Sequence, residues 1–134
     1  MSETLSRKDT AIMYMERAED LWKMEEWEEA RTSFFRGVEA WKQAAAQDPA
    51  LESKWRAAQE RFKEYMRDDE LYKTLLPECK RIIAETPGIR QTELYKAFDD
   101  FSDDDVRQVV YFAEKFGEII RKKEGRTYTL ILPK

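Results

Sequence analysis

The spacing of apolar residues changes once along the chain, near Gly117, and this change constrains the fold more than any other feature. Before it, apolar side chains recur every three or four residues, the period of a helix that buries one face. After it, residues 127–132 (TYTLIL) are rich in β-branched and aromatic side chains, which favour strands. The sequence therefore predicts a mainly α-helical protein that ends in a β-hairpin.

Three helices are predicted in the first half of the chain, at residues 8–24, 27–47 and 50–69. The apolar stripe of the first contains Ile12, Met15, Ala18, Leu21 and Trp22, and that of the second contains Trp27, Ala30, Phe34, Gly37, Val38 and Trp41. Asp48-Pro49 separates the second helix from the third. We expect these helices to pack together as one unit, residues 1–70.

The first helices of the second unit, residues 71–134, are marked by a proline and a short apolar pair. A helix at residues 75–85 is expected to begin near Leu75, because Pro77 is tolerated only in an opening turn or at a kink. Pro87-Gly88 then ends it, and a helix of about two turns follows with Leu94 and Phe98 on one face.

A third helix of this unit, residues 102–116, has a clear start and stop. Ser102 is placed to cap it, three aspartates occupy its first turn, and Gly117 ends it. Its apolar face consists of Val106, Val109, Val110, Ala113 and Phe116. Two strands, beginning at Ile119 and Thr127, then flank a tight turn at residues 124–126.

Residues 87–94 (PGIRQTEL), together with Val106, Val110, Ala113 and Gly117 at offsets of four, seven and eleven, resemble the winged helix-turn-helix family. This family supplies the DNA-binding module of many prokaryotic regulators. The resemblance implies that residues 71–134 form a winged helix domain, in which residues 102–116 are the recognition helix and the hairpin is the wing.

The same resemblance implies a DNA-binding site. The residues that it places near DNA are Arg90 and Gln91 at the second helix, Arg107, Gln108 and Tyr111 on the recognition helix, and Arg121, Lys122, Lys123 and Arg126 on the wing. Two observations leave another interpretation open. The aspartates at the start of the recognition helix would face phosphates, and lysines on a hairpin also prevent strands from pairing at a sheet edge.

The first two helices resemble a single tetratricopeptide repeat, a helical hairpin that binds peptides and proteins when several copies stack. The matching residues are Tyr14, Ala18, Leu21, Trp27, Ala30, Phe34 and Gly37. The resemblance implies a TPR-like hairpin capped by the third helix, which dimerises or recruits a partner. The alternative is a helical hairpin that only fills a core.

The charge of the chain limits how it can bind nucleic acid. The formal net charge is −4, and residues 1–70 hold 12 Lys and Arg against 17 Asp and Glu, whereas residues 71–134 hold 12 against 11. Neither half is the strongly basic body of a nonspecific nucleic-acid binder. Any affinity for DNA must therefore come from a local patch.

Enzyme chemistry has little support in the sequence, and we expect no catalytic residue, cofactor or metal. The chain has no histidine, and its four glycines are isolated, so zinc sites, histidine-dependent catalysis and glycine-rich phosphate loops lack their usual residues. The aspartates at residues 99–105 lack the glycine and glutamate of an EF-hand. The single cysteine, Cys79, lies among apolar residues and is expected to be a buried thiol.

No apolar run reaches 18 residues, and the opening residues MSETLSRKDT lack the apolar segment of a signal peptide. We therefore expect a cytoplasmic protein that does not contact membranes. The function favoured by the sequence is that of a DNA-binding regulatory or accessory protein. Its partners would be double-stranded DNA and, through the N-terminal helices, another protein or a second copy. The alternative is a protein–protein interaction adaptor whose winged helix does not bind DNA.

Overall fold

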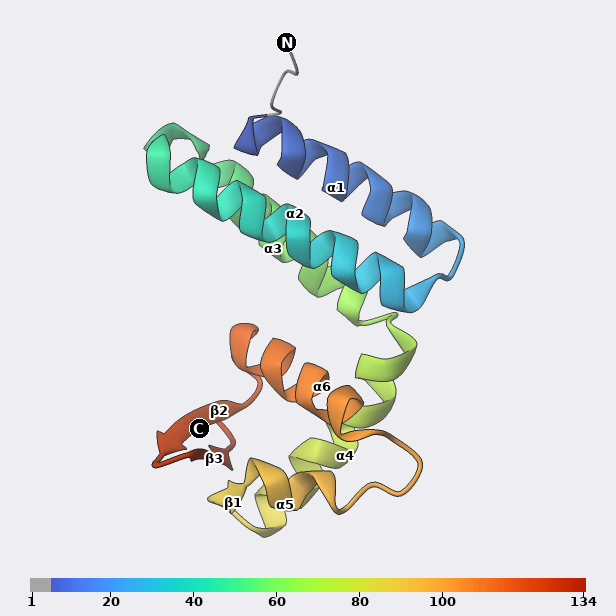
Figure 1. The fold of residues 1–134 in the computed structure, drawn as a ribbon, viewed down its shortest axis with the longest axis vertical. Coiled ribbons are helices and arrows are strands. Elements are labelled where there is room, and N and C mark those ends of the chain that lie inside the picture. The colour runs from blue at the N-terminus through green and yellow to red at the C-terminus, as the bar shows by residue number, and fades with distance from the viewer. Residues whose placement is uncertain (1–5) are drawn as a thin grey trace. The chain divides into compact units, whose positions relative to one another are not determined.

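The computed structural model of the chain describes residues 6–134 and is mainly helical, with one small sheet near the C-terminal end (Figure 1). The first part of the predicted polar opening, residues 1–5, lies outside the described residues. The chain divides into two compact units, Met1–Asp69 (unit 1) and Glu70–Lys134 (unit 2). None of the helices in the described part is long and apolar enough to cross a membrane.

Unit 1 consists of α1 (Arg7–Lys23), α2 (Trp27–Gln47) and α3 (Glu52–Met66), and α2 packs against both of the others. The bounds of α2 are those predicted from the sequence. Ser6 caps α1 by accepting a hydrogen bond from the backbone N–H of Asp9 at 3.1 Å. The predicted third helix is shorter than expected, because Pro49–Leu51 forms a 3₁₀ turn (η1) before α3 begins.

Aromatic side chains fill the centre of unit 1. Phe34 of α2 lies 4.9 Å from Tyr65 and 5.8 Å from Phe62, both on α3, measured between ring centroids. Trp22 of α1 meets Tyr65 edge-on at 5.3 Å. Such pairs contribute about 0.5–1.5 kcal/mol each beyond the area that they bury. One aromatic cluster therefore joins all three helices.

A charged pair is buried beside this cluster. The Nε atom of Arg31 donates to Oδ2 of Asp69 at 3.1 Å, and the two side chains are only 6% and 0% exposed. The Tyr65 hydroxyl lies 2.5 Å from the same carboxylate oxygen and 2.8 Å from the carbonyl of Trp27. Because burial deprives Asp69 of water, its arginine and tyrosine partners are what make the buried charge tolerable.

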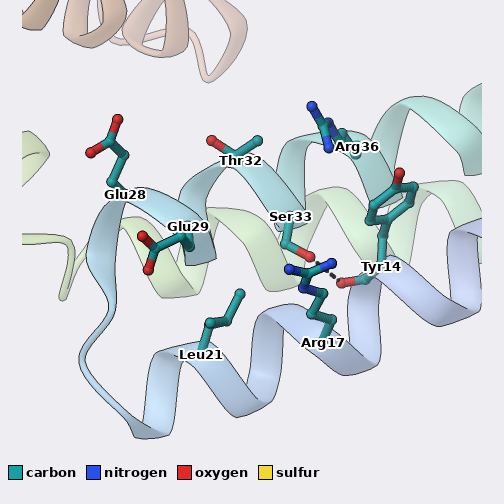
Figure 2. Close-up of a pocket in the computed structure, with 8 residues that line it drawn as sticks. All are labelled: Tyr14, Arg17, Leu21, Glu28, Glu29, Thr32, Ser33 and Arg36. Atoms are coloured by element: carbon teal, nitrogen blue, oxygen red, sulfur yellow. Dashed lines mark hydrogen bonds between the residues drawn. The ribbon is translucent and has the colours of Figure 1, made fainter.

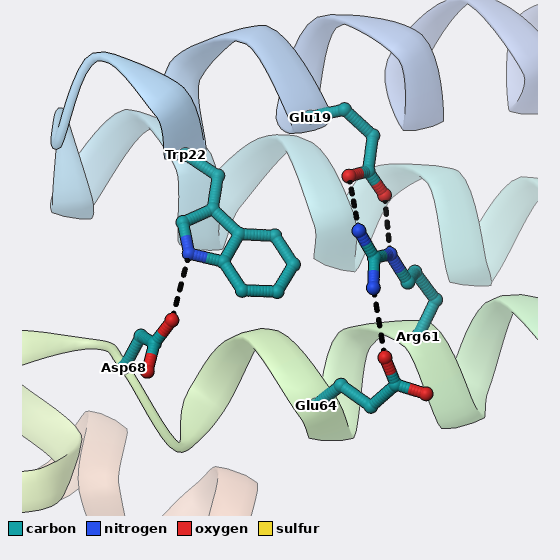
Figure 3. A network of polar contacts seen from close by, with 5 residues as sticks. All are labelled: Glu19, Trp22, Arg61, Glu64 and Asp68. Atoms are coloured by element: carbon teal, nitrogen blue, oxygen red, sulfur yellow. Dashed lines mark hydrogen bonds and ion pairs between the residues drawn. The ribbon is translucent and has the colours of Figure 1, made fainter.

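A second network joins α1 to α3 near the surface (Figure 3). The guanidinium of Arg61 binds both carboxylate oxygens of Glu19, at 2.6 and 2.7 Å, and also Glu64 at 2.7 Å. Its charged centre lies 4.6 Å from the ring centroid of Trp22, whose indole N–H donates to Asp68 at 3.1 Å. Arginine, unlike lysine, can make these in-plane and stacking contacts at once.

The close approach of α1 and α2 depends on a glycine. A Cβ atom built on Gly37 would lie 2.6 Å from Sδ and 2.9 Å from Cγ of Met15. Those distances are shorter than van der Waals contact, so Met15 occupies the space that any larger residue at position 37 would need.

Unit 2 consists of α4 (Glu70–Glu85), β1 (Ile89–Arg90), α5 (Gln91–Tyr95), α6 (Asp103–Lys115), β2 (Ile120–Glu124) and β3 (Thr127–Ile131). The strands form an antiparallel sheet in the order β1-β3-β2. Gly125 has φ +63° in the hairpin turn, a conformation that favours glycine.

Three features of unit 2 differ from the sequence prediction. Helix α4 begins at Glu70 and contains Pro77, which the sequence placed in the opening turn. The tertiary packing of α4 outweighs the lost hydrogen bond to the carbonyl four residues earlier. Helix α5 has five residues and ends before Phe98. The two-residue strand β1 was not predicted, because its pairing with β3 joins residues far apart in sequence.

The core of unit 2 is mainly aliphatic, although Tyr72 and Phe112 are also buried. The fully buried large side chains are Leu75, Ile83, Leu94, Val106, Val109, Val110, Ile119 and Leu130. Ser102 and Asp105 form a reciprocal capping box at the start of α6, with Ser102 Oγ accepting from the Asp105 N–H at 3.1 Å. The predicted cap is therefore confirmed, and so are four positions of the predicted apolar face, whereas the fifth, Phe116, follows the helix and is half-buried.

Candidate functional site

The pairing of the three strands places cations in a row on one face of the sheet. Thr129 on the central strand is opposite Arg90 of β1 and Lys122 of β2. Residues directly opposite one another in an antiparallel sheet point to the same face. The next row, which contains the fully buried Leu130, points to the other face, toward the core. Arg90 and Lys122 therefore share the outer face.

The cations of unit 2 differ in whether they have carboxylate partners. On or beside the helices, Lys73, Lys80, Arg81, Lys96 and Arg107 each form an ion pair. Arg90, Lys122, Lys123 and Arg126 are all exposed, and none has an ion-pair partner within residues 6–134. We call these four the sheet cations. All were predicted from the sequence to contact DNA, and the strand pairing brings Arg90 beside the hairpin.

Arg121, also predicted to contact DNA, points inward instead. It is opposite Leu130 in the sheet, its side chain is 18% exposed, and its Nη2 atom lies 3.2 Å from a carboxylate oxygen of Glu114. Its guanidinium also lies 4.1 Å from the ring centroid of Tyr128. Sequence alone does not reveal this, because it depends on Arg121 lying in the row of the buried Leu130, on the face toward the core. Lys123 alternates to that same face but lies next to the end of β2, near the hairpin turn, and stays exposed.

Gln91, also predicted to contact DNA, is likewise buried. It is 5% exposed, and its side-chain NH₂ donates to the Tyr95 hydroxyl at 2.6 Å. The Oε1 atom is buried and has no hydrogen-bond partner among the described residues. The first residue of α5 therefore faces the interior, whereas its neighbour Arg90 remains exposed.

The exposed side of α6 is not cationic. Arg107 forms an ion pair with Asp104 one turn earlier, and its guanidinium lies 5.7 Å from the ring centroid of Tyr95. Gln108 and Tyr111 are half-buried. Three aspartates in the first turn favour the helix dipole but repel phosphate. This helix therefore offers little positive charge to a nucleic acid.

No known protein family, curated protein or solved structure matches the chain. A function for this chain therefore has to be inferred from the arrangement of its own side chains. Within residues 6–134, no group of three or more His, Cys, Asp or Glu side chains is placed to hold a metal ion. Cys79 is buried, as predicted, and desolvation followed by the charge of Glu78 raises the pKa of its thiol to about 12. At neutral pH it is a protonated thiol without nucleophilic character.

Unit 1 contains a groove between α1 and α2 that the sequence did not reveal (Figure 2). Its volume is about 310 Å³, and its lining residues are Tyr14, Arg17, Leu21, Glu28, Glu29, Thr32, Ser33 and Arg36. Figure 2 shows the two glutamates at one end and Arg36 with Tyr14 at the other. The spacing of Glu28, Thr32 and Arg36, four residues apart, is the sequence signal that could have indicated one shared face.

Charges within the groove are crowded at the acidic end. The pKa of Glu29 is raised, first by a hydrogen bond and the charge of Glu26, while Arg17 acts in the opposite direction. The Ser33 hydroxyl donates to the carbonyl of Tyr14 at 2.8 Å, so it is already satisfied. The exposed Glu28 and Arg36 have no ion-pair partner within the described chain.

Proposed function

We propose that unit 2 is a winged helix that binds the backbone of double-stranded DNA through the sheet cations. The order helix, strand, helix, helix, hairpin, with β1 completing the sheet, agrees with the family resemblance. The observation that carries the proposal is the distribution of cations. Those on or beside the helices are mostly paired, whereas the four sheet cations are exposed and have no carboxylate partner in the part of the chain that the structure describes. Phosphate oxygens would supply the missing partners.

The proposed contact has little sequence specificity. The Arg107–Asp104 pair and the acidic first turn keep α6 from acting as a strong reader of base edges. Backbone contacts position a protein without reading sequence, and nonspecific affinities are on the order of 10⁻⁴ to 10⁻⁶ M at physiological salt. The role that fits is an accessory or regulatory DNA-binding protein that needs another source of specificity.

For unit 1 we propose a TPR-like fold. Its α1–α2 hairpin corresponds to one TPR-like repeat with α3 as a cap. In support, Ala18, Ala30 and Phe34 are fully buried where the repeat places interlocking residues, and Gly37 contacts the opposite helix. This hairpin would contribute a protein contact rather than a DNA contact.

The experiment is a fluorescence-anisotropy titration of a random-sequence duplex with the full chain at several salt concentrations. The association constant should fall steeply as salt rises, with a log–log slope of about −3 to −4 if all four sheet cations engage phosphates. A Lys122→Glu/Lys123→Glu variant should lose measurable binding, because two contacts are replaced by repulsion.

The matched control is Lys8→Glu/Lys54→Glu, which makes the same change in net charge at exposed positions of unit 1. It should bind with an affinity within about twofold of the unchanged chain. Absence of binding at about 50 micromolar protein in low salt, where nonspecific binders are tighter than at physiological salt, would contradict the proposal. An equal loss in the control would also contradict it, because the effect would then follow net charge alone.

A specific observation favours the adaptor as a second candidate. Ile120 and Ile131 are opposite each other on the outer face of the sheet and are 43% and 41% exposed. An exposed apolar pair suits a protein surface better than a phosphate backbone. If the unchanged chain fails to bind duplex, this pair and the adjacent Lys122 become the first positions to probe for a protein contact.

A further inference from the structure

We propose that unit 1 forms a two-fold symmetric homodimer in which the α1–α2 groove face of one copy meets the same face of a second copy. The contact would pair Glu28 and Glu29 of each copy with Arg36 of the other. This inference goes beyond DNA binding and does not depend on it, because all the residues concerned lie in unit 1.

The charges on α2 are arranged so that the face is complementary to itself. Glu28, Thr32 and Arg36 are four residues apart and lie along one exposed side of the helix, with a span of roughly 12 Å between the outer two. A two-fold axis that passes near Thr32 reverses the direction of the partner's helix. Each acidic end then faces a basic end, as isologous symmetry requires.

Within one copy, the charged residues at the two ends of this face lack partners of opposite charge among the described residues. Buried Arg31, half-buried Arg61 and exposed Arg56 have carboxylate partners. Among residues 6–134, Arg36 contacts only the ring of Tyr14, whose centroid lies 5.8 Å from its guanidinium. Glu29 is crowded by Glu26, which raises the pKa of its carboxyl. A cation from a second copy would relieve that crowding. One copy therefore lacks charges that a second copy carries at the matching positions.

Apolar side chains beside the groove would add to the contact. Met13 of α1 and Met24, the residue that follows α1, are 44% and 65% exposed, and helical spacing places both on the side of α1 that carries Arg17 of the groove. Exposed ion pairs alone contribute little, because water and salt screen them, so burial of methionine surface is needed as well. A purely acidic or purely basic partner would meet repulsion at one end, which is why a second copy fits better.

The test is sedimentation velocity of the full chain without DNA, in low salt and up to about 100 micromolar, where weak dimers are populated. The average mass of the unchanged chain should rise with concentration from 16.1 kDa toward twice that value. A Glu28→Arg/Glu29→Arg variant and an Arg36→Glu variant should each weaken self-association at least about tenfold. An equimolar mixture of the two should regain dimer, because a basic face then meets an acidic face.

The control is Glu16→Arg/Glu60→Arg, which makes the same charge change as the first variant at exposed positions of α1 and α3. It should dimerise like the unchanged chain. Circular dichroism checks that every variant keeps its helix content. The proposal is overturned if the unchanged chain stays monomeric, if the variants still dimerise, if the control loses the dimer, or if folded variants fail to associate when mixed.

Discussion

Units 1 and 2 contain similar numbers of cations but place them differently. Unit 1 buries Arg31 against Asp69 and ties Arg61 to Glu19, so its charged side chains hold helices together. Unit 2 has a mainly aliphatic core and leaves its sheet cations at the surface. The same residue types therefore join helices in one unit and stay exposed in the other, and the difference lies in burial and in carboxylate partners rather than in composition.

The largest expected effect comes from removing the buried carboxylate of Asp69, which tests whether charged pairs stabilise unit 1. Asp69→Ala should lower the free energy of unfolding of unit 1 by about 3–5 kcal/mol, because it leaves the Arg31 charge buried without its partner. Urea unfolding followed by tryptophan emission measures the loss, since all four tryptophans precede residue 70.

Glu64→Ala is the matched control for this prediction, because it removes a carboxylate from an exposed arginine pair. Its effect should stay below about 1 kcal/mol. If the two variants lost similar amounts of stability, the buried pair would not be what holds unit 1 together.

The single cysteine gives unit 2 its own probe. Folding raises the pKa of the Cys79 thiol from 9.0 to about 12, so at pH 9 iodoacetamide should alkylate the folded chain about 500-fold more slowly than the urea-unfolded chain. The folded state favours the neutral thiol. Its contribution to stability is therefore complete below pH 9 and is lost as the pH rises toward 12. Equal alkylation rates in the two states would show that the core of unit 2 is open.

The smallest expected effect is the difference in duplex binding between substitutions at the adjacent residues Arg90 and Gln91. Gln91→Met should change duplex affinity by less than about twofold, because the side chain is buried. Arg90→Gln should make the log–log slope of the association constant against salt shallower by about 0.9, the contribution of one phosphate contact. Anisotropy titrations at three salt concentrations measure both. A larger effect of Gln91→Met would place the binding surface at α5 rather than on the sheet.

Local sequence signals predicted much of the fold. The bounds of α2 follow from its apolar stripe, and Ser102 with the aspartates after it predicts the start of α6. The two-residue strand β1 escaped prediction because its partners lie on β3, about forty residues away in the chain. The early start of α4 escaped because Pro77 indicated a break that packing overrides.

The candidate site was harder to predict, because which side a residue faces depends on pairing between distant segments. The sequence grouped Arg121 with Lys122, and only the strand register separates them. It grouped Gln91 with Arg90, although one is buried and the other exposed. The partnership of Arg31 with Asp69, 38 residues apart, leaves no local pattern at all.

At Gly37, the separation of α1 and α2 can be changed without altering any of the charged residues discussed above. Because Met15 fills the space beside it, a larger side chain at position 37 would act as a wedge between α1 and α2. The groove begins at Arg36, the preceding residue, so such a wedge would alter its width while leaving all eight lining side chains chemically unchanged. The width of the groove can therefore vary independently of the chemistry of its lining. Substituting residues of increasing size at position 37 would change the width and leave the lining side chains as they are.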